Sequence, residues 1–112
     1  MQDPAADIAE VVYEIVRLIP AGRVSSYGAI ARAVGMISGA RMVGFLMGRC
    51  GAVEPKVPAH RVVNSSGLLT GKFHFGPGNE MQRLLEREGI TVENDRIRDF
   101  KKLFWDPSEE IR

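Results

Sequence analysis

The sequence contains few of the side chains that catalysis and metal binding most often use. Its 112 residues include one cysteine, Cys50, and two histidines. A single cysteine excludes an internal disulfide, and with only two histidines beside it no zinc site with the usual ligand spacing can be formed. The glycine-rich loop that binds phosphates in nucleotide enzymes is absent as well. We therefore expect neither a metal ion nor an organic cofactor.

Long apolar runs are also absent. No segment of about 18 consecutive apolar residues occurs, so the sequence predicts no transmembrane helix. The first ten residues contain three acids and no base, whereas a secretory signal begins with positive charge. With 45% hydrophobic residues, the chain can bury one modest core without disulfides. We expect an intracellular protein with a single domain over residues 1–112 and a core at about residues 7–105.

Charge is distributed unevenly along the chain, although the formal net charge is only +1. Residues 1–16 contain four acids and no base, and residues 73–112 contain nine acids and seven bases. Residues 17–72 contain eight bases and one acid, Glu54, which gives this segment a charge of +7. A basic centre between acidic ends favours a polyanionic partner. Chance clustering on a solvated face is the alternative.

Apolar spacing and turn residues predict a mainly α-helical fold with a small β element. Helices are expected over residues 7–19, 26–34, 40–49 and 79–88. The second and third of these are short and are separated by the glycine-containing turn 35–39. Such a pair indicates a helix-turn-helix, although many helical domains contain one.

The remaining segments lack a clean period. Residues 58–63 predict a short buried strand or an irregular segment, because Val62 and Val63 are β-branched. Residues 68–75 alternate loosely and contain a glycine, which suits a hairpin-like wing or a loop. Residues 91–105 are expected to form short pieces packed over the core, with a disordered end after Pro107.

The sequence contains no nucleophilic side chain with an activating group close to it in the chain. His60 and His74 could act as bases, but neither has a nucleophile beside it. Cys50 follows the expected helix over residues 40–49, where the negative end of the helix dipole disfavours a thiolate. The ordinary interpretation of Cys50 is a small, buried or half-buried apolar residue.

Four separated segments form a specific pattern. The first is Pro58-Ala59-His60-Arg61-Val62-Val63, and the others are residues 22–31, residues 40–44 and Glu88-Gly89. Taken in their order along the chain, these segments resemble the O6-alkylguanine-DNA alkyltransferase family. Residues 58–63 resemble its Pro-Cys-His-Arg-Val motif, with Ala59 in place of the acceptor cysteine. The alanine, and the lack of the family's usual N-terminal domain, are typical of the alkyltransferase-like proteins, which bind alkylated guanine without dealkylating it.

The resemblance implies a winged helix-turn-helix domain that binds O6-alkylguanine in duplex DNA and flips the damaged nucleotide into a pocket. Arg41 would fill the gap left in the base stack, and Tyr27 would help to rotate the nucleotide. The backbone amides of Gly39 and Ala40 and the hydroxyl of Ser65 would contact DNA phosphates. The lesion pocket would be lined by Tyr27, Met47, Pro58, Ala59 and Val62.

The resemblance also implies what happens to a bound lesion. His60 and Glu88 correspond to the pair that activates the missing thiol, so we expect a structural hydrogen bond between them and no enzymatic activity. The lesion would be left for nucleotide excision repair, with UvrA as the expected partner in a bacterium. We expect a monomer in the cytoplasm, associated with the nucleoid of a bacterium, or in the nucleus of a eukaryote.

Residues 71–78 depart from the pattern. This segment, Gly-Lys-Phe-His-Phe-Gly-Pro-Gly, is longer than the pocket-rim loop of the family. Cys50 stands about where the family has a hinge asparagine.

Two other classes of function remain open. The chain could be an alkyltransferase, either with Cys50 as its acceptor or inactivated by an engineered cysteine-to-alanine change at Ala59. It could also be a winged-helix transcription regulator, which would select a base sequence instead of a lesion.

Overall fold

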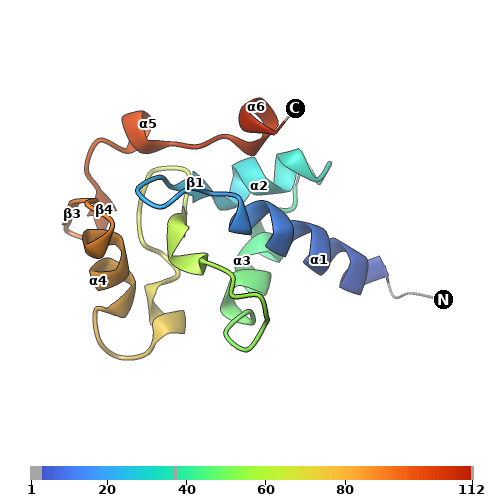
Figure 1. Cartoon of the computed structure of the whole chain (residues 1–112), viewed down its shortest axis with the longest axis horizontal. Helices are drawn as coiled ribbons and strands as arrows, with labels where there is room; N and C mark the ends of the chain where they lie inside the picture. The colour runs from blue at the N-terminus through green and yellow to red at the C-terminus, as the bar shows by residue number, and fades with distance from the viewer. Residues whose placement is uncertain (1–3, 37, 112) are drawn as a thin grey trace.

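The first three helices form the half of the molecule that contains both the N-terminus and the helix-turn-helix (Figure 1). The structure is a computed structural model that describes residues 4–36 and 38–111, with only the backbone described for residues 4–7. The three helices are α1 (Pro4–Arg17), α2 (Tyr27–Ala33) and α3 (Ala40–Gly48). α2 packs against both α1 and α3. The expected helix-turn-helix is confirmed.

Local sequence explains where the helix-turn-helix begins and turns. The hydroxyl of Ser26 accepts a hydrogen bond from the amide of Ala29 at 3.1 Å and so caps α2. Gly35 follows α2 with a φ of +80°, a conformation in which a side chain would be strained. Ile30 on α2 and Val43 on α3 are both fully buried. Capping and burial together hold α3 against α2.

A short parallel pairing connects the helix-turn-helix to the segment that contains Ala59. β1 (Ser25–Ser26) pairs with β2 (Val62–Val63), with Ser25 opposite Val62. A 3-10 turn, η1 (Ala59–Arg61), immediately precedes β2. Residues 58–63 therefore contain both an irregular turn and a short buried strand. Because the two strands are parallel, η1 lies at the end of the pairing where β1 begins, and the start of α2 lies at the other end.

The C-terminal half contains shorter elements. These are η2 (Lys72–Phe75), α4 (Glu80–Arg87), β3 (Val92–Glu93), β4 (Arg96–Ile97), α5 (Phe100–Leu103) and α6 (Pro107–Glu110). β3 and β4 form an antiparallel pair. The hairpin interpretation of residues 68–75 is wrong, because this segment is a loop that ends in η2. The loop is joined to the β3–β4 pair by a bridge between Leu68 and Arg96 and by a hydrogen bond from the amide of Leu69 to the carbonyl of Asp95 at 2.8 Å.

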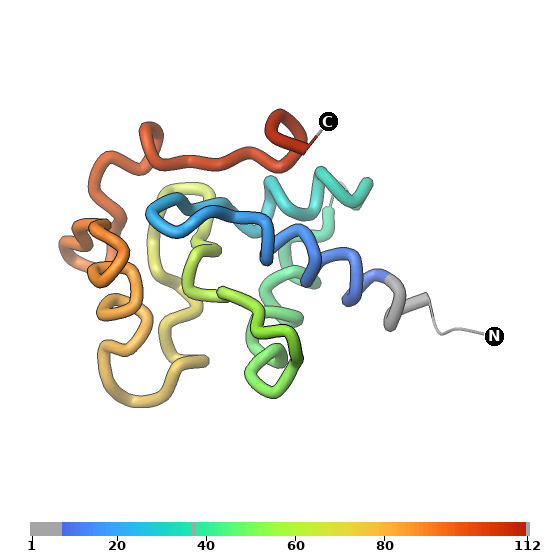
Figure 2. The backbone as a smooth tube through the Cα atoms, in the orientation of Figure 1, coloured from blue at the N-terminus to red at the C-terminus, as the bar shows by residue number. Residues whose placement is uncertain are grey.

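Residues 107–110 form a helix, so the expectation of disorder after Pro107 is wrong for this stretch. Pro107 is buried and begins α6, and the side chain of Asp106 caps this helix by accepting from the amide of Ser108 at 3.0 Å. α6 packs against α2. In Figure 2 the chain from α5 to α6 runs along the top of both halves of the molecule.

Two clusters of buried side chains make up the core. One lies among α1, α2 and α3 and includes Val12, Ile30 and Trp105. The other surrounds α4 and includes Met81 and Leu85. The ring of Phe75 packs against both clusters. Among the helices that the structure describes, none combines the length and the apolar character that crossing a membrane requires.

Candidate nucleic-acid interface and pocket

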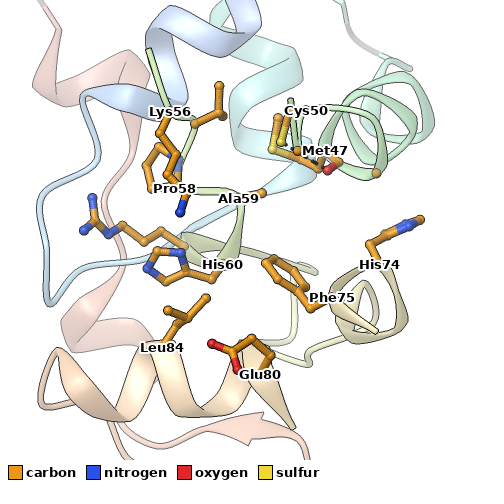
Figure 3. A pocket seen from close by; sticks show the side chains of 14 residues that line it. Met47, Cys50, Lys56, Pro58, Ala59, His60, His74, Phe75, Glu80 and Leu84 are labelled. Carbon is orange, nitrogen blue, oxygen red and sulfur yellow. Dashed lines mark hydrogen bonds between the residues drawn. The ribbon is translucent and has the colours of Figure 1, made fainter. Parts of the chain in front are cut away.

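A pocket of about 530 Å³ lies at the junction of α3, η1, η2 and α4 (Figure 3). This volume lies within the usual range for small-molecule sites, roughly 300–1,000 Å³. Its lining includes Met47, Cys50, Lys56, Pro58, Ala59, His60, His74, Phe75, Glu80 and Leu84. Three of the residues expected in a lesion pocket, Met47, Pro58 and Ala59, are therefore brought together. Further lining comes from the loop before η1, from His60 and Arg61, from η2 and from α4.

At position 59 the pocket presents only a methyl group. The side chain of Ala59 contains no sulfur, oxygen or nitrogen that could attack an alkyl carbon. Ala59 is the first residue of η1 and is 8% exposed, so the side chain at this position faces little solvent. The position is therefore enclosed, as a pocket residue should be, but its side chain has no reactive atom.

His60 and Arg61, which line the pocket, form a hydrogen-bonded cluster with Glu88. His60 Nε2 and Glu88 Oε2 are 2.7 Å apart, so the expected hydrogen bond between the two residues is present. Arg61 donates to the same carboxylate from Nε at 3.1 Å and from Nη2 at 2.8 Å. The amide of Gly22 donates to Glu88 Oε1 at 3.0 Å, and Arg61 Nη1 donates to the carbonyl of Ile19 at 2.9 Å. Glu88 thus joins α4, η1 and the loop after α1.

The cluster shifts the pKa of both titratable members. Burial by itself raises the pKa of Glu88, but the hydrogen bonds from Arg61, His60 and Gly22 outweigh it and lower that pKa to about 2. Burial lowers the pKa of His60, although Glu88 opposes the effect. At neutral pH Glu88 is therefore anionic and His60 is neutral. The 2.7 Å contact assigns the proton of the imidazole to Nε2, which leaves Nδ1 as an acceptor.

A second, shallower hollow of about 330 Å³ brings Tyr27 and Arg41 together. The lining comes from α2, α3, η2 and the loop before η2, and consists of Tyr27, Ala40, Arg41, Gly44, Thr70, Gly71 and His74. Burial raises the pKa of Tyr27, and an interaction with Thr70 partly offsets this shift. The phenol therefore keeps its proton at neutral pH and can donate a hydrogen bond. Arg41 is exposed.

His74 forms a wall common to the pocket and the hollow, since it lines both. Its ring lies directly against Gly48 of α3, where an added Cβ would come within 2.6 Å of His74 Cε1. On the other side, an added Cβ at Gly71 would lie 2.6 Å from the hydroxyl of Tyr27. Glycine at both positions therefore leaves room for the two rings. In the sequence His74 could be considered only as a candidate base, because its place between two cavities depends on η2.

Three predicted site residues need correction. Tyr27 lines the hollow and not the pocket. Val62 lines neither cavity, because its pairing with Ser25 holds it in the core, where it is fully buried. The amide of Gly39 already donates to the carbonyl of Met36 at 3.0 Å within the turn, so it is not available to a phosphate. Ala40, the first residue of α3, is exposed.

The remaining predicted phosphate contact, Ser65, lies on an exposed turn after β2. It lines a hollow with Arg32 and Lys101, and it does not line the hollow of Tyr27 and Arg41. In the parts of the chain that the structure describes, no group of three or more His, Cys, Asp or Glu residues is arranged to hold a metal ion.

Sequence comparison places this arrangement in a known family. The sequence model of the 6-O-methylguanine DNA methyltransferase DNA-binding domain matches residues 7–90. The chain belongs to this family. Its helix-turn-helix, η1 and α4 all lie within the matched range, whereas β3, β4, α5 and α6 lie beyond it.

Relatives within the family confirm the expected resemblance to alkyltransferase-like proteins. Alkyltransferase-like protein 1 of Schizosaccharomyces pombe is 41% identical over 101 residues, covering 86% of this chain and 92% of the relative. The DNA base-flipping protein of Vibrio parahaemolyticus is 34% identical over 99 residues, covering 86% and 93%. The bifunctional methyltransferase/endonuclease of Thermoplasma volcanium is 38% identical over 99 residues, but this chain spans only 30% of its length.

A solved structure agrees with these sequence relatives. The S. pombe Atl1 protein, in complex with damaged DNA containing O6-carboxymethylguanine, superposes with a TM-score of 0.75 at 35% identity. The match covers 94% of this chain and 98% of that one, so it extends beyond residue 90 into the C-terminal elements. The fold is that of a family member with its helix-turn-helix in place.

Proposed function

We propose that this chain acts as one DNA-binding domain that binds O6-alkylguanine in duplex DNA by flipping the damaged nucleotide into the pocket at Ala59. The observation that carries the proposal is the adjacency of two cavities. The pocket of Ala59 and the hollow of Tyr27 and Arg41 have His74 as a common wall. Groups suited to displacing a base therefore stand beside an enclosed space of a size that suits small ligands.

The residues of the hollow suit the displacement itself. A base inside a duplex can be inspected only after its nucleotide is rotated out of the stack, and this costs a few kcal/mol. Arg41 is long, planar and exposed at the first turn of α3, so it can enter the vacated gap and hydrogen-bond the orphaned partner base. Tyr27 stands opposite on α2, where its protonated phenol can meet the rotating nucleotide.

The pocket suits retention without repair. The methyl group of Ala59 accepts no alkyl group, and the cluster of His60, Arg61 and Glu88 has no thiol at this position to activate. The alkylated base would therefore remain where it is bound. This state differs from the product of a transferase, in which the lesion has been removed.

The gel-shift experiment that tests this proposal compares two duplexes of one sequence, with and without a single O6-methylguanine. We expect the lesion duplex to bind at least 10-fold more tightly, because only the alkylated base gains contacts in the pocket. A second pair with permuted flanking sequence is expected to give the same ratio. Equal affinity for damaged and undamaged duplexes would refute lesion recognition. A strong dependence on flanking sequence would instead support a transcription regulator.

An enzymatic alternative rests on one specific observation, because Cys50 lines the same pocket as Ala59. The surroundings of the thiol argue against this role. Burial raises its pKa, and Sγ donates to the carbonyl of Met47 at 3.3 Å. At neutral pH the residue is therefore a protonated thiol already engaged at the end of α3, and the reactive thiolate is scarce.

Mass measurement shows whether Cys50 accepts an alkyl group or remains an unreactive thiol. After incubation with O6-methylguanine DNA, we expect intact-protein mass spectrometry to show no gain of a methyl group. The Cys50→Ala variant, incubated in parallel, is expected to give the same unchanged spectrum. A stable gain of one methyl group in the wild type that is absent from Cys50→Ala would establish a transferase.

The fate of the bound lesion is part of the same proposal. Because the alkyl group stays in place, another pathway must remove it, and we propose nucleotide excision repair, with UvrA as the partner in a bacterial cell. One chain supplies both cavities, so we propose that a monomer binds each lesion. The site of action would be the DNA-containing compartment, which is the nucleoid region of the bacterial cytoplasm or the eukaryotic nucleus.

A further inference from the structure

A second group of basic residues lies around Ser65, at the point where the C-terminal segment crosses the molecule. Two hollows, of about 330 and 550 Å³, both have Ser65 and Lys101 in their lining. The smaller also includes Gly28 and Arg32 from α2, and the larger includes Arg96 and Lys102. The surface therefore combines a hydroxyl with several cations from three separate segments.

The charges of this surface are largely uncompensated. Asp99 is the one carboxylate that lines either hollow. In the described residues, the Lys and Arg ion pairs are Arg61–Glu88, Lys72–Asp95 and Arg98–Glu93. The four bases around Ser65, which are Arg32, Arg96, Lys101 and Lys102, take part in none of these pairs. Exposed cations that outnumber the carboxylates beside them suit an external anion.

α5 is held firmly in this position. Arg23 donates from Nε to the carbonyl of Leu103 at 2.9 Å and from Nη2 to that of Phe104 at 2.7 Å. Backbone hydrogen bonds add to this anchor, since Val24 donates to Leu103 at 3.1 Å and Trp105 donates to Val24 at 2.7 Å. A ligand of α5 therefore meets basic side chains on a backbone that is already ordered, which lowers the entropic cost of binding.

The turn that carries Ser65 is fixed against α5 as well. The side chain of Asn64 accepts from the amides of Ser66 at 2.9 Å and Leu68 at 2.8 Å. Gly67 has a φ of +81° and lies against the ring of Phe100, where an added Cβ would be 2.9 Å from Cγ. Because the turn packs on α5 through this contact, the hydroxyl of Ser65 and the ammonium of Lys101 lie on one surface.

This surface continues from the hollow of Tyr27 and Arg41. Tyr27 and Gly28 are consecutive residues in the first turn of α2, and they line the two different hollows. Ser65 and Thr70 likewise belong to one short loop and face the two hollows separately. The two hollows therefore lie on neighbouring parts of α2 and of the loop after β2.

We infer that Arg32 and Lys101 extend the phosphate contact that the family resemblance implies for Ser65 into a second site, which binds the duplex backbone on one side of the flipped nucleotide. The inference rests on the proposed function for the identity of the duplex. A hydroxyl donor with Arg and Lys beside it is a common protein arrangement for a DNA phosphate. Since α5 lies beyond the family match of residues 7–90, the C-terminal segment adds a phosphate contact that the matched domain does not contain. This contact is expected to strengthen binding to damaged and undamaged DNA equally.

Salt-dependent binding of the Lys101→Ala variant tests this site. Dissociation constants are measured for the O6-methylguanine duplex and its undamaged match between 50 and 200 mM NaCl. A lost phosphate contact reduces the slope of log K against log salt by about 0.9. We expect this decrease together with a several-fold loss of affinity for both duplexes, so that the lesion preference is unchanged.

The matched control is Arg83→Ala, which removes one positive charge from an exposed position on α4 that lines neither hollow. We expect its slope to stay within experimental error of the wild type. A Lys101→Ala slope equal to that of Arg83→Ala would overturn the second site. This failure is distinguishable from failure of the proposed function, which would show as equal binding of both duplexes by the wild type.

Discussion

Replacement of Arg41 by alanine is expected to weaken binding to a duplex that contains O6-methylguanine by about 50-fold, while binding to the same lesion in a single strand changes less than about threefold. Flipping leaves a gap in the stack, and unstacking costs on the order of a few kcal/mol for each base step. Arg41 offsets this cost by filling the gap, and each 1.4 kcal/mol lost lowers affinity by about tenfold. A single strand has no gap to fill, so the loss there is limited to that of one positive charge.

The Arg49→Ala variant is the matched control for charge. Arg49 follows α3 directly, is exposed and lies over the ring of Phe45 at 5.2 Å, but it does not line the hollow of Tyr27. We expect it to weaken duplex and single-strand binding by similar small factors. Fluorescence titration with both substrates measures the ratio. If Arg41→Ala weakens both substrates alike, Arg41 is only a phosphate contact and some other group fills the stack.

The parts of the site that could be predicted from sequence are those determined by short segments. Ser26 caps α2 within three residues, and Gly35 turns the chain after it, so the helix-turn-helix can be predicted from local patterns. Ala59 could be identified because it stands within a six-residue motif. The family resemblance implied that Tyr27 and Arg41 act on the same nucleotide, and both residues line one hollow in the structure.

The parts that could not be predicted depend on contacts between distant segments. Arg61 belongs to the same motif as His60, but its two-nitrogen contact with Glu88 requires α4 to pack against η1. The place of His74 depends on Gly48 and Gly71, which leave room for rings from other elements. The order after Pro107 depends on α6 packing against α2. Helical periodicity and turn propensity contain no information on these long-range contacts.

Removal of the Glu88 carboxylate is expected to have the largest effect on stability. In Glu88→Ala, His60 and Arg61 lose their shared partner while both remain largely buried, with side chains 12% and 18% exposed. Leaving buried hydrogen-bonding and charged groups unpaired costs several kcal/mol, and because Arg61 keeps its bond to Ile19 we expect a loss of about 3 kcal/mol. Urea unfolding followed by circular dichroism measures this value.

A neighbouring acid on the same helix provides the control for the loss of charge and of helical side chain. Glu86 is exposed, and its hydrogen bond to Gln82 at 3.2 Å lies on the surface of α4. We expect Glu86→Ala to change the free energy of unfolding by less than about 0.5 kcal/mol. If the two variants were equally stable, the cluster of His60, Arg61 and Glu88 would contribute nothing beyond an ordinary surface contact.

The same cluster determines how stability depends on pH. The pKa of Glu88 lies at about 2 in the folded protein and near its usual value of 4.5 in the unfolded chain, so below pH 4.5 the unfolded chain binds the proton more readily. The stability that Glu88 contributes is therefore complete above pH 4.5 and is lost as the pH falls toward 2. The lowered pKa of His60 acts in the same direction from about pH 6.5 downward, because the folded state resists protonation of the buried ring. The wild type is expected to lose stability more steeply between pH 4.5 and 2 than Glu88→Ala, in which this titrating carboxylate is gone. Parallel stability curves for the two proteins across that interval would show that Glu88 titrates normally and that its contacts do not favour its charged form.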